Sequence, residues 1–383
     1  MRVLMVVRQF YPWIGGTENQ AQKLAGKLID LGIEVQVVTG WWQRGTRRKE
    51  MIGKIPVFRN FTCWGMLGIK GLRKFGGYIY ILSLFLFLWR HRHRYDLIHI
   101  HKLSYPAFPG VIAGRLFRKK TLVKIANSGK YSDIRRMREN YLLLGQKKML
   151  ASTLSADRII AVNNQIINEL QEAGVPYKRI VLIPNGVELD LSKRKTDYGL
   201  NDPVKVVFTG RLHPQKALDV LLKAFQQIIA VRPDLDWRLS IIGDGPLRLE
   251  LEKLTNQLRI TQNVKFWGPI HNVSDHLAKA DIFALPSWAE GMSNAMLEAM
   301  AHGLPCVASR ISANKDLIEH GEQGLLVAPG DSNDLAKAII CLADDERLRQ
   351  KLGTSSFQEI EGKYNLNAVA KQYIVNYQQL LQM

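Results

Sequence analysis

Cysteine is scarce in this chain. Three of its 383 residues are cysteine, and they are scattered along the sequence as Cys63, Cys306 and Cys341. Three separated thiols are too few for a disulfide framework or a zinc site, and such scarcity is typical of proteins from a reducing compartment. We therefore expect buried thiols in a cytoplasmic protein.

Hydrophobic runs long enough to cross a membrane are also lacking. Residues 78–89, YIYILSLFLFLW, form a strongly apolar segment of twelve residues, whereas a spanning helix needs about 20. Residues 3–7 are too short for the core of a secretory signal, and Arg8 interrupts them. Because Lys74 and the RHRHR run at 90–94 flank the apolar segment, two interpretations remain. It is either a core helix or a helix whose aromatic face enters a membrane surface while its arginines contact headgroups.

Acidic residues are few in the first half of the chain. Residues 1–195 contain 34 Lys and Arg against 12 Asp and Glu, a net charge of +22, whereas the remainder contains 19 against 22, a net charge of −3. A positive field of this size attracts nucleic acid or an anionic membrane surface. No nucleic-acid-binding motif is recognisable. We therefore expect no nucleic-acid partner and a peripheral position on the inner face of the cytoplasmic membrane.

Glu290 and Glu298 frame a glycine-containing loop and the start of a predicted helix. Residues 281–286 have the length and apolar character of a strand that ends at proline, and residues 294–302 have helical composition. The loop between them should lie at a helix N-terminus, where backbone N–H groups favour hydroxyl or phosphate oxygens. Glu290 can accept hydrogen bonds from sugar hydroxyls, and Glu298 can bind a vicinal diol such as a ribose.

The segment FALPSWAEGMSNAMLEAMAHGLP at residues 283–305 resembles the donor-site signature of the GT4 family of retaining glycosyltransferases, which have the GT-B fold. Shorter segments match the family in order: ADRIIA at 156–161, IPNGV at 183–187, GDGP at 243–246 and FWG at 266–268. The resemblance extends over residues 1 to about 330. It implies that a nucleotide-diphosphate sugar is bound by Gly16, Gly291, Met292, Ser293, Asn294 and Glu298.

A predicted strand at residues 205–209 is followed, after a glycine, by the sequence RLHPQK. GT4 enzymes use an arginine and a lysine at this spacing to hold the donor diphosphate, so the resemblance implies that Arg211 and Lys216 act in catalysis with Glu290. Two cations fixed at the end of a strand can neutralise the charge that develops on a departing diphosphate. This chain has Ala217 where the family usually has glycine, and we expect that difference to affect only the local turn.

A second glycine loop follows the first predicted strand. Gly15 and Gly16 precede a helix that we expect over about residues 19–31, and paired glycines let the backbone approach a phosphate near a helix N-terminus. In GT4 enzymes this loop lies opposite the donor diphosphate and near the acceptor. The resemblance therefore implies a donor contact at Gly16 and an acceptor or sugar contact at Glu18.

The chain departs from the family after the predicted strand at residues 121–126. Many GT4 enzymes have a histidine there, close to the reacting sugar, whereas this chain has Asn127 and Ser128. These two residues can offer neutral hydrogen bonds to the sugar or acceptor instead. His99 and His101, at the end of the preceding strand, are alternative replacements, although a histidine at a strand end is more often structural.

A nominal D-x-D motif, the signature of metal-dependent GT-A enzymes, occurs at residues 234–236. It follows Arg232 and Pro233 and directly precedes a predicted strand, so we interpret it as a turn. We expect no metal and no cofactor other than the nucleotide sugar itself.

Apolar segments of strand length alternate with helical segments in both halves. The predicted strands are at 3–7, 35–39, 56–60, 97–101, 121–126, 158–162, 205–209, 238–242, 264–267, 282–285, 306–309 and 324–327. This alternation predicts an α/β protein with two doubly wound parallel sheets and ligands at the carboxyl ends of the strands. The resemblance implies a GT-B fold, in which two Rossmann-like domains face a central cleft. We expect an acceptor-binding domain at residues 1–195, with residues 365–383 packing back on it, and a donor-binding domain at residues 196–364.

The activity implied by the resemblance is transfer of a sugar, with retention of its configuration, from a nucleotide-diphosphate sugar to a hydroxyl group. The basic first half points to a glycan or lipid-linked acceptor, as in the synthesis of cell-surface polysaccharide or lipopolysaccharide. The alternatives are a phosphorylase or an epimerase of the same fold, or a basic nucleic-acid-binding protein. The carboxylate loop disfavours the epimerase, and no family context indicates the Schiff-base lysine of a pyridoxal-dependent phosphorylase.

Overall fold

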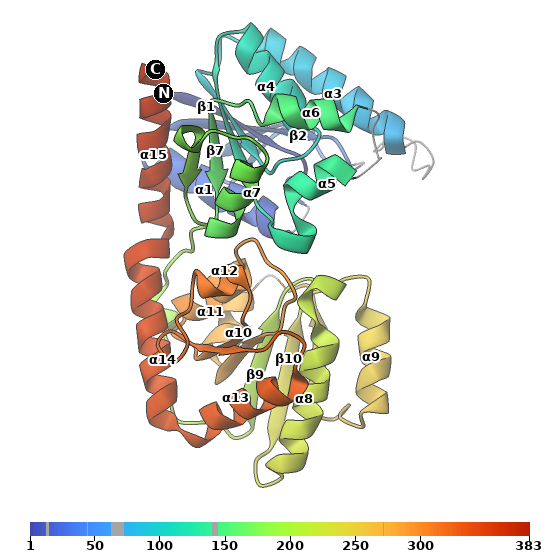
Figure 1. Ribbon diagram of the computed structural model, residues 1–383, viewed down its shortest axis with the longest axis vertical. Helices are drawn as coiled ribbons and strands as arrows, with labels where there is room; N and C mark the ends of the chain where they lie inside the picture. Colours follow the sequence, from blue (N-terminus) through green and yellow to red (C-terminus); the bar gives the residue numbers. More distant parts are fainter. Residues whose placement is uncertain (13–14, 44, 63–72, 140–144, 271) are drawn as a thin grey trace. The chain divides into compact units, whose positions relative to one another are not determined.

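The computed structural model describes residues 1–12, 15–43, 45–62, 73–139, 145–270 and 272–383. The chain divides into two compact units, each built on a largely parallel sheet flanked by helices (Figure 1). Unit 1 comprises Met1–Gly186 and Leu366–Met383, and unit 2 comprises Val187–Asn365. The predicted α/β class with two doubly wound sheets is confirmed.

The described residues of unit 1 form an eight-stranded sheet in the order β3-β4-β2-β1-β5-β6-β7-β8. The strands are β1 (Arg2–Val7), β2 (Glu34–Gly40), β3 (Lys49–Ile52), β4 (Ile55–Asn60), β5 (Leu97–His101), β6 (Lys120–Ile125), β7 (Arg158–Ala161) and β8 (Ile180–Leu182). Neighbouring strands are parallel except β3 and β4, an antiparallel pair at one edge. The helices include α1 (Gly16–Asp30), α3 (Arg73–Arg90), α4 (Ala107–Leu116), α5 (Asp133–Glu139), α6 (Gln146–Thr153), α7 (Asn164–Glu172) and α15 (Leu366–Gln382).

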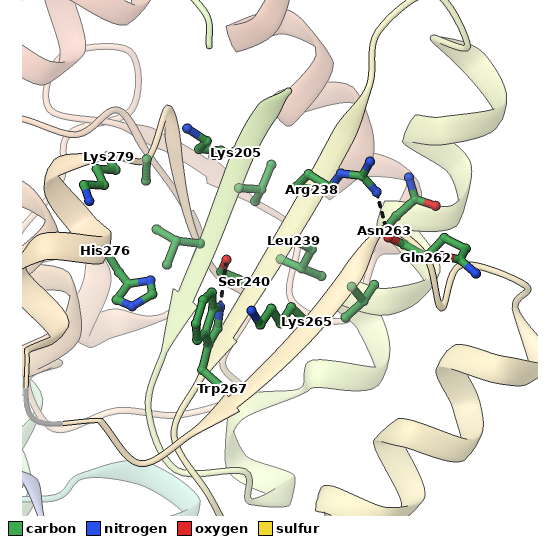
Figure 2. Close-up of a pocket in the computed structure, with 14 residues that line it drawn as sticks. Lys205, Arg238, Leu239, Ser240, Gln262, Asn263, Lys265, Trp267, His276 and Lys279 are labelled. Atoms are coloured by element: carbon green, nitrogen blue, oxygen red, sulfur yellow. Dashed lines mark hydrogen bonds between the residues drawn. The ribbon is translucent and has the colours of Figure 1, made fainter. Parts of the chain in front are cut away.

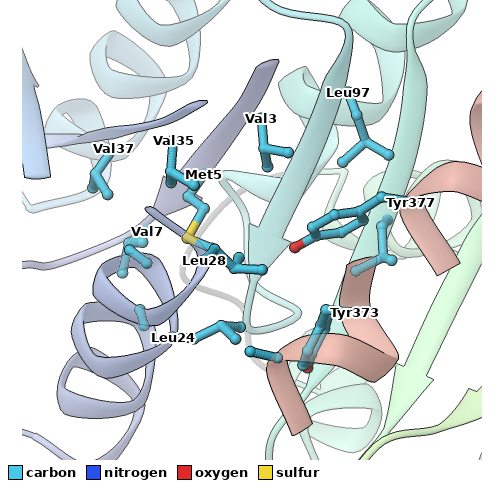
Figure 3. Close-up of a cluster of buried hydrophobic side chains, with 14 of the residues drawn as sticks. Val3, Met5, Val7, Leu24, Leu28, Val35, Val37, Leu97, Tyr373 and Tyr377 are labelled. Atoms are coloured by element: carbon cyan, nitrogen blue, oxygen red, sulfur yellow. The ribbon is translucent and has the colours of Figure 1, made fainter. Parts of the chain in front are cut away.

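One core cluster joins the first residues of unit 1 to its last helix. Alternate residues of β1 project to the same face of the sheet. Figure 3 shows Val3, Met5 and Val7 of β1 in one cluster with Leu24 and Leu28 of α1 and with Tyr373 and Tyr377 of α15. Fully burying such a side chain contributes about 1.5–3 kcal/mol. Helix α15 is therefore an integral part of unit 1, although about 180 residues of unit 2 precede it in the sequence.

Unit 2 has a six-stranded parallel sheet in the order β11-β10-β9-β12-β13-β14 across its described residues. The strands are β9 (Val204–Thr209), β10 (Trp237–Ile242), β11 (Val264–Gly268), β12 (Ile282–Leu285), β13 (Cys306–Ser309) and β14 (Leu325–Val327). The helices include α8 (Leu218–Val231), α9 (Arg248–Gln257), α10 (Val273–Ala278), α11 (Asn294–Ala301), α12 (Ser312–Lys315), α13 (Ser332–Asp344) and α14 (Glu346–Glu359). Strands β12 and β13 are buried along their whole length, as expected where crossover helices cover both faces of a parallel sheet.

The division between the units lies nine residues before the expected boundary at 195. Residues 187–195 belong with unit 2 because they bond to it at both ends. The N–H of Val187 donates to the Tyr364 carbonyl at 2.9 Å, and that of Lys195 donates to the His302 carbonyl at 2.8 Å. The return of the chain to unit 1 begins at Leu366, one residue after the expected position.

Helix α3 packs on the sheet with one apolar side and exposes another, so the structure supports the core-helix interpretation for one side and leaves the membrane interpretation a prediction. One side is fully buried through Tyr80, Leu84 and Leu88. The other side presents residues that are between 36% and 60% exposed: Tyr78, Leu82, Leu86 and Trp89. No helix in the described part of the chain is long and apolar enough to cross a membrane.

The cysteines differ in their surroundings. Cys306 is buried in β13, and burial raises the pKa of its thiol. Cys341 is exposed on α13, so the expectation of a buried thiol is wrong there, because its side chain lies on the outer side of that amphipathic helix. Cys63 lies outside the described residues.

Candidate functional site

The candidate site in unit 2 lies where two loops leave the adjacent strands β9 and β12. The chain leaves β9 toward β10 and β11 on one side, and it returns to β12 on the other side. Ligands of doubly wound sheets bind outside the carboxyl ends of the strands at such a reversal. Gln215 ties the two loops together, because its carbonyl accepts from the Trp288 N–H at 2.9 Å and its side-chain amide donates to the Ala289 carbonyl at 2.6 Å.

The two loops meet in an ion pair between predicted catalytic residues. Lys216 Nζ lies 2.5 Å from Glu290 Oε1, although the residues are 74 positions apart in the sequence. The Ser287 hydroxyl donates to the same carboxylate oxygen at 2.7 Å. The side chains of Lys216 and Glu290 are 15% and 7% exposed, so each charge needs its partner to offset the cost of leaving water. The structure thus brings together two of the three residues to which sequence analysis assigned catalysis.

Arg211, the third of these residues, is exposed on a tight turn after β9. Gly210 has φ 149°, and Gly243 at the end of β10 has φ 128°, values that favour glycine. A side chain at position 243 would collide with the main-chain oxygen of Gly210. The two glycines therefore let the ends of β9 and β10 approach each other and fix the backbone that carries Arg211.

Ala217 occupies the position where the family usually has glycine. It has φ 49° and ψ 44° and is the N-cap of α8. Left-handed backbone costs a non-glycine residue roughly 1–2 kcal/mol. The difference from the family is local, but it puts strain on the turn that carries the neighbouring Lys216.

The loop after β12 leads into α11, and the remaining predicted donor residues of unit 2 belong to this segment. Ser293 is the N-cap of the helix, and its hydroxyl accepts from the Met296 N–H at 3.3 Å. Gly291 and Met292 are buried before it, Asn294 is half-buried at its first position, and Glu298 is half-buried in its second turn. A helix N-terminus favours negatively charged groups, so this end of α11 suits a phosphate beside a carboxylate one turn further on.

The first glycine loop in unit 1 differs from its expected form. Gly16 is already the first residue of α1, three positions before the expected start, and Gly15 is the N-cap. The Glu18 carboxylate folds back over Gly15, so a side chain at position 15 would collide with it. An acidic residue in the first turn is stabilised by the helix dipole, which explains the early start. Gly16 and Glu18 thus lie together at the N-terminus of α1, near the end of β1.

His101 is buried within unit 1, with 2% of its surface exposed. Its ring centroid lies 4.2 Å from that of His99, whose Nδ1 is bonded to the Tyr377 hydroxyl at 2.6 Å. Within the described residues, neither ring nitrogen of His101 has a hydrogen-bond partner. Because a buried ring does not reach a substrate, this position favours the structural role for His101.

Lys124 is the third ionisable member of this buried cluster, which we call the histidine–lysine cluster (His99, His101 and Lys124). It is directly opposite His101 in the register of β5 and β6. Its Nζ donates to Asn185 Oδ1 at 2.8 Å. Burial lowers the pKa of Lys124 to about 7. Burial also lowers the pKa of His99 and of His101, with Lys124 as a further cause in both.

Asn127 and Ser128 form part of the loop after β6. The Asn127 side chain donates to Asp133 Oδ1 at 2.9 Å, and its main-chain N–H donates to Oδ2 of the same residue at 3.2 Å. The Ser128 hydroxyl is 1% exposed and accepts from Asn163 at 3.2 Å. Both side chains therefore hold the loop in shape, whatever further contact they make.

The D-x-D segment forms a turn, as the sequence indicates. Asp234 pairs with Arg232 at 2.7 Å, and Asp236 pairs with Arg238 at 2.8 Å. Each carboxylate is thus neutralised by a nearby arginine, Arg232 at the end of α8 and Arg238 in β10. No group of three or more His, Cys, Asp or Glu side chains suited to a metal ion occurs among the residues that the structure describes.

Sequence reasoning missed three residues that shape these sites. Ser287 lies three positions before Glu290 and could have been found from that spacing. Gln215 and Lys124 gave no local signal, because a bridging amide and a buried lysine are defined only by what folds against them. The predicted residues Gly16, Glu18, His101, Asn127 and Ser128 belong to unit 1, and the others belong to unit 2.

Two family models match this chain. Residues 14–191 match "Glycosyltransferase Family 4", and residues 203–345 match "Glycosyl transferases group 1". The N-acetyl-alpha-D-glucosaminyl L-malate synthase of Bacillus anthracis is 25% identical over 97% of this chain and 96% of its own. The UDP-Gal:alpha-D-GlcNAc-diphosphoundecaprenol alpha-1,3-galactosyltransferase of Escherichia coli is 28% identical over 66% of this chain and 68% of its own.

Solved structures agree on the fold. The crystal structure of HepE from Anabaena in complex with UDP-glucose superposes with a TM-score of 0.77 at 19% identity, over 99% of this chain and 100% of that one. The order of both sheets, the site between β9 and β12 and these matches lead to one conclusion. The chain belongs to the GT4 family of glycosyltransferases and has the GT-B fold.

Proposed function

We propose that this glycosyltransferase moves a sugar, with retention of configuration and without a metal ion, from a nucleotide-diphosphate sugar to a hydroxyl of a glycan or lipid-linked acceptor. The observation that carries the proposal is the contact between Lys216 and Glu290 at the reversal of the sheet order, beside the N-terminus of α11. The E. coli relative is named for transfer from UDP-Gal to alpha-D-GlcNAc-diphosphoundecaprenol, and this supports a nucleotide-sugar donor and a lipid-linked acceptor.

The donor would be held along the loop and helix after β12. Glu298 can bind the ribose diol through two carboxylate oxygens, and the start of α11 favours the diphosphate. Glu290, at the other end of the loop, can accept hydrogen bonds from the sugar that is transferred. Two glutamates eight residues apart in the sequence can thereby bind the two ends of one donor.

The cations act on the leaving group. An ammonium group has three N–H donors, so Lys216 can hold Glu290 and a diphosphate oxygen at the same time. Arg211, exposed on its turn, adds a second cation for the charge that develops as the anomeric carbon–oxygen bond breaks. The acceptor oxygen bonds to the anomeric carbon on the same face, and its proton passes to the departing phosphate oxygen. The products are the glycosylated acceptor and a nucleoside diphosphate.

The first domain would bind the acceptor at a membrane surface. Helix α3 ends at the exposed Arg90, and Arg92 and the exposed Arg94 follow directly after it. An apolar helix face bordered by basic residues is typical of helices that lie in the surface of an anionic membrane. This supports a peripheral position on the cytoplasmic face, where lipid-linked acceptors are present.

A donor screen tests the proposed chemistry. We expect one of the UDP-, GDP-, ADP- or dTDP-sugars to stabilise the protein by about 2.7 kcal/mol at 100 times its Kd. Arg211→Ala and Lys216→Ala should each lower turnover roughly 10²-fold, because both act on charge in the transition state. Activity should persist in EDTA. Complete inhibition by EDTA that manganese reverses would overturn the metal-independent mechanism.

A further inference from the structure

A groove of about 470 Å³ lies on one face of β9, β10 and β11, apart from the loops of the candidate site. The crossover from β11 to β12 carries, in its described residues, the six-residue helix α10, which contacts β9. A helix of that length does not cover the outer strands of the sheet. Figure 2 shows the side chains of the three strands that line the groove, with His276 and Lys279 beside them.

Four cations line this groove. The strand register places Arg238 directly opposite Lys205, and it places Ser240 opposite Lys265 on the next strand. Alternate residues of a strand share a face, so these side chains line one surface, which Lys279 completes after α10. None of the fourteen described residues that line the groove is Asp or Glu. The second half of the chain has a net charge of −3, so its composition does not explain such a gathering of positive charge.

The charges in this groove are poorly compensated. Arg238 pairs with Asp236 at 2.8 Å, and both side chains are 44% exposed. No carboxylate among the described lining residues pairs with Lys205, Lys265 or Lys279. The nearby Asp275 forms its ion pair with Lys193, and Lys279 only helps to lower its pKa. Like charges directly opposite each other across two strands are destabilising. A bound anion would remove that cost.

Trp267 fixes one of the cations. The ring is 38% exposed, its indole N–H donates to Ser240 Oγ at 3.2 Å, and Lys265 Nζ lies 3.5 Å from the ring centroid. A cation–π contact of this kind holds the ammonium group over the groove. His276 packs against the other side of Trp267, with its ring centroid 4.5 Å away. Burial, followed by the charge of Lys279, lowers the pKa of His276.

We propose that this groove is a second carbohydrate-binding site, which holds acidic sugar units of the glycan on which the enzyme acts. Its cations are spread over three strands about 4.8 Å apart instead of converging on one point, an arrangement that suits charges distributed along a chain. The Ser240 hydroxyl and the amide groups of Gln262 and Asn263 lie among them and can exchange hydrogen bonds with sugar hydroxyls. The identification of the ligand as a glycan rests on the proposed function.

Calorimetric titration of the full chain with tetragalacturonate tests this site, with neutral maltotetraose as the matched probe. The groove variant combines Lys205→Gln, Lys265→Gln and Lys279→Gln. The control variant removes the same charge from exposed lysines on α8, α9 and α13, through Lys223→Gln, Lys253→Gln and Lys337→Gln. The groove variant should weaken tetragalacturonate binding roughly tenfold or more, and the control should change it less than about twofold. Binding by the basic unit 1 is common to all three proteins, so their comparison isolates the groove.

Trp267 provides a local readout. Tetragalacturonate should change the tryptophan emission of the native chain, and Trp267→Phe should abolish most of that change. Equal weakening in the groove and control variants, or unchanged binding in the groove variant, would overturn the proposal. Tighter binding of single-stranded DNA with the same dependence on the three lysines would assign the groove to nucleic acid instead. The nucleotide-sugar stabilisation should remain intact in the groove variant, so failure of the donor screen alone counts against the transfer mechanism and not against the groove.

Discussion

The two glutamates of the carboxylate loop should have separable effects on catalysis. Glu290→Gln should mainly lower kcat, because Glu290 lies against Lys216 at the proposed position of the reacting sugar. Glu298→Ala should mainly weaken donor binding, because Glu298 lies further along α11, at the proposed ribose position. Loss of a hydrogen bond to a charged group costs about 1.5–3 kcal/mol. Initial-rate kinetics would measure this cost as a lower kcat for Glu290→Gln, and donor titration would measure it as a higher Kd for Glu298→Ala.

Thermal unfolding supplies the control for these variants. Glu290→Gln leaves Lys216 with a neutral partner in a mostly buried position, so some loss of stability is expected, whereas half-buried Glu298 should tolerate alanine. Unchanged kinetics in both variants would contradict the assignment of the donor site.

Single residues were predictable from sequence where their identity is fixed by chemistry, and unpredictable where it depends on packing. The loop sequences alone were enough to predict Glu290, Lys216 and Arg211 as site residues. The burial of His101 beside Lys124 could not be predicted, because the local sequence around a histidine at a strand end is the same whether or not another element covers it. Helix α15, which the sequence places far from β5, packs Tyr377 against the neighbouring His99 and Tyr373 against Lys124.

Helix α3 carries the prediction that belongs to single elements. The protein should float with liposomes that contain anionic lipid and remain behind with neutral ones, and salt should weaken the binding because it screens the arginines. The combined variant Arg90→Gln, Arg92→Gln and Arg94→Gln should lower partitioning by roughly one to two orders of magnitude, at about 1 kcal/mol per basic residue. Neutralising Lys223, Lys253 and Lys337 in unit 2 is the matched control and should leave flotation unchanged. Equal recovery with neutral and anionic vesicles would contradict electrostatic attachment.

Strands that lie buried in the hydrophobic core were the most predictable elements. The strands at 97–101, 282–285 and 306–309 match β5, β12 and β13, because a buried parallel strand is nearly continuously apolar. Strand β3 was missed, because its sequence KEMI lies at a sheet edge and its residues are exposed or half-buried. The start of α1 was misplaced, because its N-cap is Gly15, which has no polar side chain to mark the beginning of a helix.

The stability of the whole molecule should depend on pH through Lys124. Burial lowers its pKa from 10.5 to about 7, so between these values the unfolded chain binds more protons than the folded one, and stability rises with pH. The limit is about 1.4 kcal/mol per pH unit. The unfolding midpoint of the native chain should therefore rise relative to that of Lys124→Met as the pH increases from 7 to 10. Below pH 7 the difference between the two midpoints should no longer change with pH.

Lys178→Met, at an exposed position of unit 1, is the control for this experiment. Its unfolding midpoint should stay parallel to that of the native chain over the same range. A constant difference between the native chain and Lys124→Met would show that Lys124 stays charged when folded.

At the scale of the molecule, the sequence predicted two sheets and the return of the chain, but it misplaced the boundary by nine residues. The predicted boundary followed the lapse of helical periodicity. The actual one is set by main-chain hydrogen bonds of Val187 and Lys195 to distant carbonyls, which leave no trace in local composition.

The place of α15 in the core of unit 1 has a consequence for synthesis on the ribosome. Unit 2 is one uninterrupted stretch, so all of its strands emerge before the chain reaches residue 366. Unit 1 starts first but lacks Tyr373 and Tyr377 until the last helix is made. Domains usually fold in the order in which they leave the ribosome. Here most of unit 1 is made before unit 2, whereas the helix that completes its core is made after unit 2. A ribosome that stalls inside unit 2 therefore leaves the apolar side chains of β1 and α1 without the cover of α15.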